Sequence, residues 1–350
     1  KNNIMNKTLV SLLAAVFPVF ILQAQEPYFL VDPTLTPDGN TIIFSYDSDL
    51  WSVPSKGGNA SRLTAMMGDE TLPRVSPDGQ WLAFSSTVDG NTNIYLMAME
   101  GGEIRQLTFH DGVDEVDSWS WDSKNIYFTS NRENRFAGYQ IAFSGGTPKR
   151  LFNSYFDYSH NIAEHPKTEE IFFNESWESK SFSNRKRYKG AFNPDIKSYH
   201  PKTKEYKEYT DYIGKDMWPV FDKNGSLYFV SDEANGEYNL YTLQNNTKRQ
   251  LTSFKSSIGR PQINVEGNRV VFTKDYQIFL YDVAAGSAQK VKITLANNNP
   301  LEKNKDFNSK GNITNFSVSP DNKKLAFVSR GELFVSDVKG KYIKQIDINN

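Results

Sequence analysis

The sequence SPDGQWLAFSS at residues 76–86 decides the fold, because it joins a tight turn directly to a short apolar run. Proline presets φ at the second position of such a turn and glycine suits the fourth, which predicts a hairpin between two strands. The run Trp81–Phe84 lacks the polar alternation of a half-buried strand. It therefore predicts a strand that is buried on both faces.

The same unit returns along the chain as a turn, an apolar run, a further strand and a short strand that often ends in Leu-Thr. Clear copies occupy 36–64, 76–108 and 120–152, and looser copies begin at 165, 221, 265 and 319. The equivalent turn positions are Asp38, Asp78, Asp122, Lys167, Lys223, Glu266 and Asp321. Most of them are separated by 40 to 45 residues, which is the period of four-stranded propeller blades.

We therefore predict an all-β chain that contains a six-bladed β-propeller of four-stranded antiparallel blades at 25–296. A linker at 297–315 is rich in Asn and Lys, and the first blade of a second propeller follows at 316–350. The fourth unit carries an insertion, Asn174 to Tyr199. A single seven-bladed ring is the structural alternative.

The first 24 residues have the layout of a secretory signal peptide. Met5-Asn6-Lys7 gives a short basic start, Leu9 to Leu22 forms an apolar run, and Ala24 suits cleavage. A membrane anchor is the alternative, but a spanning helix needs roughly 20 apolar residues. We expect a periplasmic or extracellular protein that has no membrane association after cleavage.

Composition and motifs narrow the function classes. Lys and Arg number 40 against 41 Asp and Glu, which gives no electrostatic case for binding nucleic acid. The chain has no cysteine, which excludes disulfides, thiolate catalysis and Cys-based zinc sites. No GxSxG, GxGxxG or phosphate-loop motif occurs, and the four histidines lack metal-ligand spacing. We therefore expect no catalytic residue, metal or cofactor within this chain.

The loops that enter the innermost strands are the candidate binding site, because they would ring the mouth of the central channel. Their polar side chains could hold an extended peptide, although solvated turn-forming residues are an equal alternative. The candidates are Asp69, Glu70, Asp114, Glu115, His160, Lys215, Asp216 and Arg260. The basic cluster of the insertion is either a docking surface or a solvated loop, and comprises Arg185, Lys186, Arg187 and Lys189.

The Ser-Pro-Asp-Gly units resemble the repeats of TolB-like propellers and of the propellers that precede prolyl-oligopeptidase domains. Three further stretches resemble the propellers of tricorn-type peptidases: RYKGAFNPDIKSYHPKTKEYKEYTD at 187–211, the segment 239–283, and FSVSPDNKKLAFVSRGELFVSDVKGKYIKQ at 316–345. The resemblance covers essentially the whole chain after the leader, and the order of units agrees.

That resemblance implies an exported bacterial relative in which this chain is a gating and scaffold segment of a serine peptidase acting on oligopeptides. It implies as partners a peptide in the channel and the protein's own second propeller, PDZ and peptidase domains, which lie beyond Asn350; a homo-oligomer is a further option. It also suggests Arg132 and Arg135 for anchoring a substrate's C-terminus. A stand-alone TolB-type periplasmic propeller that binds a protein or peptide is the alternative.

Overall fold

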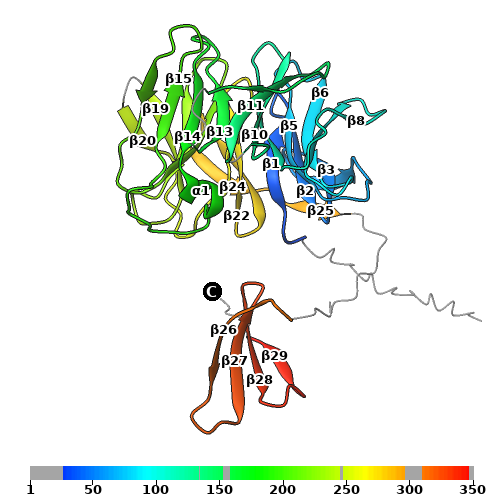
Figure 1. Cartoon of the computed structure of the whole chain (residues 1–350), viewed down its shortest axis with the longest axis vertical. Helices are drawn as coiled ribbons and strands as arrows, with labels where there is room; N and C mark the ends of the chain where they lie inside the picture. The colour runs from blue at the N-terminus through cyan, green and yellow to red at the C-terminus, as the bar shows by residue number, and fades with distance from the viewer. Residues whose placement is uncertain (1–26, 134, 153–157, 245–246, 296–309, 347–350) are drawn as a thin grey trace, which may run out of the picture. The chain divides into compact units, whose positions relative to one another are not determined.

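The computed structural model describes residues 27–133, 135–152, 158–244, 247–295 and 310–346, so the predicted signal peptide lies outside the described residues. Apart from the short helix α1 (Trp177–Ser181), the regular structure of these ranges is β-strand (Figure 1). The described residues fall into two compact units, 27–295 and 310–346. Within them, no helix is long and apolar enough to cross a membrane.

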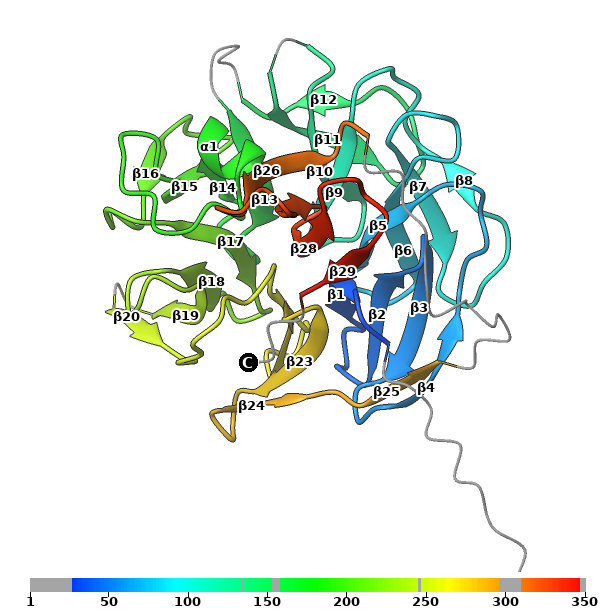
Figure 2. The ribbon, with the colours of Figure 1, turned by 90° about the horizontal axis from the view of Figure 1, so that it is seen from below.

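The first unit contains six sheets arranged as blades around one axis (Figure 2). In each blade, four strands follow one another from the axis to the rim in chain order and pair antiparallel. Blades one to three consist of β1 (Val31–Leu35), β2 (Thr41–Tyr46), β3 (Asp49–Pro54) and β4 (Gly58–Arg62); β5 (Glu70–Val75), β6 (Trp81–Ser86), β7 (Asn93–Ala98) and β8 (Arg105–Gln106); and β9 (Asp114–Trp119), β10 (Asn125–Ser130), β11 (Ala137–Ala142) and β12 (Lys149–Arg150). Blades four to six consist of β13 (Ser159–Glu164), β14 (Ile171–Glu175), β15 (Ile196–Tyr199) and β16 (Tyr206–Glu208); β17 (Asp216–Phe221), β18 (Leu227–Ser231), β19 (Asn239–Gln244) and β20 (Thr247–Gln250); and β21 (Gln262–Ile263), β22 (Arg269–Lys274), β23 (Gln277–Asp282) and β24 (Ser287–Lys290).

The apolar runs of the repeat are the second strands of the blades, and they are buried on both faces as predicted. Each run contributes a phenylalanine that is at most 2% exposed: Phe44, Phe84, Phe128, Phe172, Phe229 and Phe272. The buried apolar residues form six clusters, and each cluster joins two neighbouring blades. One of these clusters joins blade six to blade one, so the ring closes with six blades and not seven.

The Pro-Asp-Gly turns lie between the first and second strands of the blades. In Ser76–Gln80, the Ser76 hydroxyl donates to Oδ1 of Asp78 at 2.5 Å, and the Gln80 amide donates to the same oxygen at 3.0 Å. Gly79 has φ of +75°, a conformation that glycine adopts without steric cost. Asp78 is thus a turn residue, and equivalent bonds recur at Asp38, Asp122 and Asp321.

The Leu-Thr ending of the repeat also has a structural cause. Thr64 accepts a hydrogen bond from the Leu50 amide at 2.8 Å and donates one to Oε2 of Glu70 at 2.7 Å. The threonine thereby ties the outer end of the blade to its third strand. The main-chain bond recurs at Thr108, Thr210 and Thr252, whose hydroxyls donate instead to the side chain that precedes the paired amide, Asn93, Asp195 and Asn239.

Two sets of contacts close the ring between blades six and one. The Leu30 amide donates to the Tyr276 carbonyl at 3.1 Å, and Arg269 donates to the Gly39 carbonyl at 2.7 Å. After blade six, the short strand β25 (Ile293–Leu295) pairs parallel with β4, which gives blade one a fifth strand. This strand was not anticipated from the sequence.

The second unit is one antiparallel sheet, composed of β26 (Ile313–Val318), β27 (Lys324–Ser329), β28 (Glu332–Asp337) and β29 (Ile343–Gln345). Phe327 stacks on Phe334 across β27 and β28, with ring centroids 5.4 Å apart. β26 begins inside the stretch predicted as a linker. The sheet has the strand order and the turn of a propeller blade.

Candidate functional site

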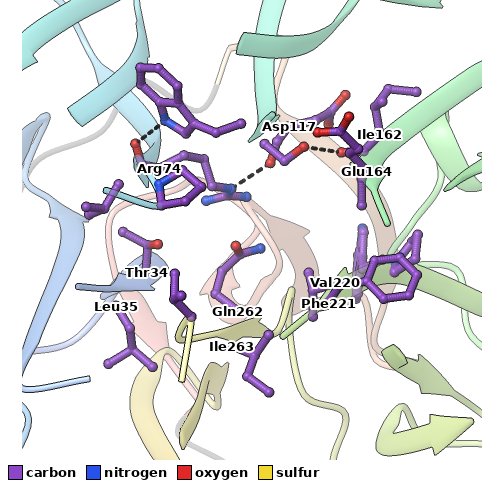
Figure 3. A pocket seen from close by; sticks show the side chains of 18 of the residues that line it. Thr34, Leu35, Arg74, Asp117, Ile162, Glu164, Val220, Phe221, Gln262 and Ile263 are labelled. Atoms are coloured by element: carbon purple, nitrogen blue, oxygen red, sulfur yellow. Dashed lines mark hydrogen bonds between the residues drawn. The ribbon is translucent and has the colours of Figure 1, made fainter. Parts of the chain in front are cut away.

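The six inner strands surround a cavity on the axis of the ring, and this channel is the candidate site (Figure 3). Its volume is about 110 Å³, and every blade contributes to its wall. The wall combines polar and apolar side chains, including Thr34, Leu35, Arg74, Val75, Asp117, Ser118, Asn161, Glu164, Val220, Phe221, Arg260, Gln262 and Ile263. Such a wall can contact both the main chain and the apolar side chains of a peptide.

Arg74 projects into this cavity and also joins two blades. Its Nε donates to the main-chain carbonyl of Asp117 at 2.8 Å, and its Nη1 donates to the Pro73 carbonyl at 2.7 Å. In return, Nε1 of Trp119 donates to the Arg74 carbonyl at 2.9 Å. Burial of the guanidinium, together with the nearby charge of Arg260, lowers the pKa of Arg74 to about 10.

Asp117, on the neighbouring inner strand β9, supplies a carboxylate beside Arg74. Its Oδ2 accepts a hydrogen bond from the Thr129 hydroxyl at 2.5 Å. Burial raises the pKa of Asp117 to about 6, although the Thr129 hydroxyl and the charge of Arg260 oppose that shift. The neighbouring Ser118 hydroxyl donates to the Ile162 carbonyl at 2.7 Å and so links blades three and four.

Three of the acids expected at the channel mouth lie inside the protein. Glu70, Asp114 and Asp216 are the first residues of their inner strands, and each is 0% exposed. Asp114 lies 2.6 Å from Nη2 of Arg132, and Asp216 lies 3.1 Å from Nζ of Lys248. The Asp114 and Asp216 pairs lie within blades three and five, and Glu70 accepts a hydrogen bond from Thr64 at the end of blade one. These buried carboxylates are not presented to a peptide in the channel.

The helix α1 accounts for three more of the expected mouth residues. Ser176 caps it by accepting hydrogen bonds from the amides of Glu178 and Ser179. The side chains of residues 178–180 each reach a different blade. Glu178 pairs with Lys215 of the segment that enters blade five, Ser179 lies 2.8 Å from Nε2 of His160 in blade four, and Lys180 pairs with Glu115 in blade three.

His160 is buried by this arrangement, and burial followed by the charge of Lys180 lowers its pKa to about 3. The imidazole is therefore neutral at physiological pH. Its Nε2 lies within hydrogen-bond distance of Ser176 and Ser179, so it joins blade four to α1. Glu115 is partly exposed; burial raises its pKa, but the Lys180 ammonium and the charge of Arg260 together outweigh burial, so the pKa of Glu115 is lowered. The insertion thus begins as a clamp over blades three to five and ends before β15 at Ile196, earlier than the sequence indicated.

The remaining candidates are distributed around the ring. Asp69 is exposed and accepts a hydrogen bond from the Ser48 hydroxyl at 2.5 Å, while Arg260 lines the cavity itself. Arg132 is held by Asp114 and lies over the rings of Phe128 and Tyr139. Arg135 is exposed beside Tyr158.

The basic cluster of the insertion contacts blade five. Lys186 and Arg187 both pair with Glu237, at 2.7 and 3.2 Å. Arg185 lies over the Tyr188 ring, and Lys189 lies over the Tyr212 ring. Glu237 therefore offsets part of the positive charge that suggested a docking surface.

The channel residues that sequence reasoning missed are Arg74, Asp117 and Gln262. They lie within inner strands, whereas the predicted site comprised the loops that enter those strands. The available signal was a charged or amide side chain inside a predicted strand that should face the axis. Asp117 also lies directly beside Ser118 and Trp119, all three of which line the cavity.

The buried acids predict how stability depends on pH. Burial raises the pKa of Glu70 to about 7, and Asp49 adds to this shift while the Thr64 hydroxyl opposes it. The folded protein therefore retains a proton between about pH 4.5 and 7 that the unfolded chain releases, so stability falls as pH rises through that window. Glutamine does not titrate, so in Glu70→Gln the free energy of unfolding should fall less as pH rises. We expect the fall between pH 5 and pH 8, measured by urea unfolding, to be smaller by up to about 3 kcal/mol than in the unaltered chain.

Glu103→Gln is the matched control, because Glu103 is an exposed residue in the connection between β7 and β8 of blade two. It should leave the pH dependence of the unfolding free energy unchanged. A Glu70→Gln variant with the same pH dependence as the unaltered chain would contradict the assigned proton.

Comparison with known proteins identifies what this propeller is similar to. A model of the tricorn protease N-terminal β-propeller domain matches residues 27–287. The chain is 26% identical over 305 residues to a tricorn protease homolog of Saccharolobus solfataricus, which covers 85% of this chain and 27% of the relative. It is 23% identical over 357 residues to the tricorn protease of Thermoplasma acidophilum, covering 94% of this chain and 31% of that protein. The chain thus spans less than a third of the length of these relatives.

Solved structures agree on the fold. The crystal structure of the tricorn protease superposes with a TM-score of 0.65 at 22% identity, covering 91% of this chain and 31% of that one. A putative TolB from Agrobacterium tumefaciens superposes with a TM-score of 0.51 at 19% identity, covering 75% of this chain and 80% of that one. At these identities, the likeness shows the propeller architecture alone.

Proposed function

The chain belongs to the family of tricorn protease N-terminal β-propeller domains, and from this premise we propose that it is the substrate-gating, non-catalytic segment of a secreted tricorn-like serine peptidase. In this proposal, the peptidase chemistry resides in the remainder of a longer protein. The propeller supplies a channel that holds or admits oligopeptides. Export rests on the leader at 1–24.

The observation that carries the gating proposal is the axial cavity with all six blades in its wall. Its volume is about 110 Å³, and the side chains of Arg260 and Gln262 line it. A peptide that passes along the axis must pass between these side chains, which can change conformation. A passage lined by movable side chains is what gating requires. The TolB likeness concerns the fold alone and does not favour a stand-alone binding protein.

Filling the channel tests the proposal in the full-length protein. Gln262 lines the cavity and points into it (Figure 3), so Gln262→Trp should obstruct passage. We expect turnover of oligopeptides by the exported protein, with its N-terminus at Gln25, to fall about tenfold or more, which corresponds to about 1.4 kcal/mol in the barrier. The 350-residue chain alone should give no turnover.

The matched control is Gln289→Trp, because Gln289 is exposed on the outer strand β24. This variant should retain full turnover. Unchanged turnover in Gln262→Trp would contradict gating through this channel, and peptide hydrolysis by the chain alone would contradict its non-catalytic role.

A further inference from the structure

The junction between blades one and two contains a buried carboxylate that lacks a counter-ion. Glu70 is 0% exposed, and its Oε2 accepts a hydrogen bond from the Thr64 hydroxyl at 2.7 Å. Its Oε1 is also buried and has no hydrogen-bond partner, and Glu70 forms no ion pair with the described residues. An unpaired charge in the interior is costly, so this carboxylate requires either a proton or a cation.

Two carboxylates at the equivalent position of other blades have a counter-ion from their own blade. Asp114 and Asp216 each begin an inner strand, as Glu70 does, and both are 0% exposed. Arg132 lies 2.6 Å from the first of them, and Lys248 lies 3.1 Å from the second. In blades three and five, the acid at this position is therefore neutralised by a side-chain cation.

Blade two has apolar residues at the positions of these two cations. Val88 lies two residues after β6, as Arg132 lies two residues after β10. Ile104 begins the stretch IRQLT, which corresponds to the stretch KRQLT that begins at Lys248. Both Val88 and Ile104 pack against the apolar cluster between blades one and two. The chain thus repeats the buried acid as Glu70 but omits the cation that accompanies it in the other two blades.

A second carboxylate oxygen lacks a donor at the same junction. Asp49 is 6% exposed, and its Oδ2 lies 2.6 Å from Nη2 of Arg62, whereas its Oδ1 is buried without a hydrogen-bond partner. In blades two, four and five, the corresponding threonine donates to the residue equivalent to Asp49, but Thr64 donates to Glu70 instead. Burial raises the pKa of Glu70 to about 7, and the charges of Asp49 and Asp69 add to that shift. These acids are therefore close enough for their charges to act on one another.

We propose that Asp49 and Glu70 bind a calcium ion through Oδ1 and Oε1, in the role that a side-chain cation has in blades three and five. Carboxylate oxygens suit Ca²⁺, which tolerates irregular geometry, whereas Mg²⁺ gives up its water reluctantly and suits a buried position less. The described residues contain no group of three His, Asp or Glu side chains that could hold a metal, so main-chain carbonyls and water must supply the other ligands. We therefore expect weak binding, with a Kd of about 10⁻⁴–10⁻³ M, as in extracellular calcium modules. Neither side chain lines the axial cavity, so calcium binding here is independent of the gating proposal.

The test is calorimetric titration of the 350-residue chain, treated with EDTA and dialysed, with CaCl₂ and separately with MgCl₂ at neutral pH and constant ionic strength. We expect one Ca²⁺ to bind per chain and Mg²⁺ to bind more weakly. Glu70→Gln and Asp49→Asn should each weaken Ca²⁺ binding by about tenfold or more, because each removes one charged ligand. Asparagine suits the position of Asp49, since Asn93 and Asn239 stand at the equivalent position of blades two and five. Asp49→Asn therefore decides the question if Glu70→Gln does not fold.

Two further variants locate the site. Glu103→Gln is the matched control, since Glu103 is exposed and the charge change is identical, and it should bind Ca²⁺ like the unaltered chain. Ile104→Lys places in blade two the ammonium that Lys248 supplies in blade five. It should abolish Ca²⁺ binding and raise the urea midpoint of the calcium-free chain, because the buried acid then has a permanent counter-ion.

Each result bears on the proposal. It is overturned if no Ca²⁺ binds up to roughly 10 mM, or if Mg²⁺ binds as tightly as Ca²⁺. Unchanged binding in Glu70→Gln and Asp49→Asn would mean that exposed carboxylates alone attract the ion, and undiminished binding in Ile104→Lys would contradict the assigned position. A bound cation would displace the proton that Glu70 retains in the metal-free chain, so the unfolding measurements on Glu70→Gln require EDTA.

Discussion

Replacing Lys215 by methionine lowers the free energy of unfolding by about 3–5 kcal/mol, because it leaves the Glu178 carboxylate buried without its counter-ion. Both side chains are 0% exposed, and Nζ of Lys215 lies 2.8 Å from Oε2 of Glu178. The ammonium also donates to the Phe182 carbonyl at 3.1 Å. The measurement is the urea midpoint with its slope, at neutral pH and 25 °C.

Two further variants identify the cause of that loss. The double variant Lys215→Met with Glu178→Leu removes both charges, so it should recover most of the lost stability. Lys223→Met disrupts a pair with Glu266 in which both side chains are about half exposed, and it should cost about 0–1 kcal/mol. If Lys215→Met and Lys223→Met shift the midpoint equally, the buried pair does not hold α1 in place.

This pair matters because α1 is the element that connects three blades at one end of the channel. Consecutive residues Glu178, Ser179 and Lys180 reach blades five, four and three. Lys180 also lies 4.3 Å from the centroid of the Phe136 ring. A loss of the Lys215 pair would release the clamp on the blade five side. The insertion thus contributes to the stability of the ring, in addition to any contact that its exposed basic residues make.

The propeller was predictable because each blade repeats the same local chemistry. Pro-Asp-Gly turns specify the hairpin, and continuous apolar runs such as Leu82–Phe84 specify strands packed between two neighbours. These features depend on residues close in sequence, and variants of them recur in all seven units of the chain. The Leu-Thr ending is also a local feature that repeats along the chain, although the sequence alone did not predict its hydrogen bonds.

The candidate site was less predictable because it depends on distant parts of the chain. Whether an acid such as Glu70 faces the channel or the blade interior depends on the local course of the inner strand. Four inner strands contain a residue with positive φ beside a register shift: Asp32, Leu72, Asn161 and Trp218. A bulge of this kind changes which side chains face the axis. Leucine and tryptophan give no sequence signal for such a conformation, since it is rare for bulky residues.

The strand β25 was not predicted for a related reason, since its pairing depends on a distant part of the chain. Three residues at the start of a polar stretch carry no strand signal, yet Ile293 is 4% exposed against blade one. A Cβ added to Gly57 would lie 2.5 Å from the Lys292 carbonyl oxygen, whereas one added to Gly101 of blade two meets nothing within 4 Å.

Gly57→Ala should therefore displace β25 and destabilise the propeller by about 2–4 kcal/mol more than Gly101→Ala, measured by the urea midpoint. Both glycines have φ of +88°, so the cost of alanine in a left-handed conformation is common to the two variants and cancels in the comparison. What remains is the loss of the buried Ile293 side chain, about 1.5–3 kcal/mol, and of the hydrogen bond from the Gly58 amide to the Lys292 carbonyl, about 1 kcal/mol. Equal midpoints for the two alanine variants would mean that β25 contributes nothing to closing the ring, and that the contacts of Leu30 and Arg269 between blades six and one suffice.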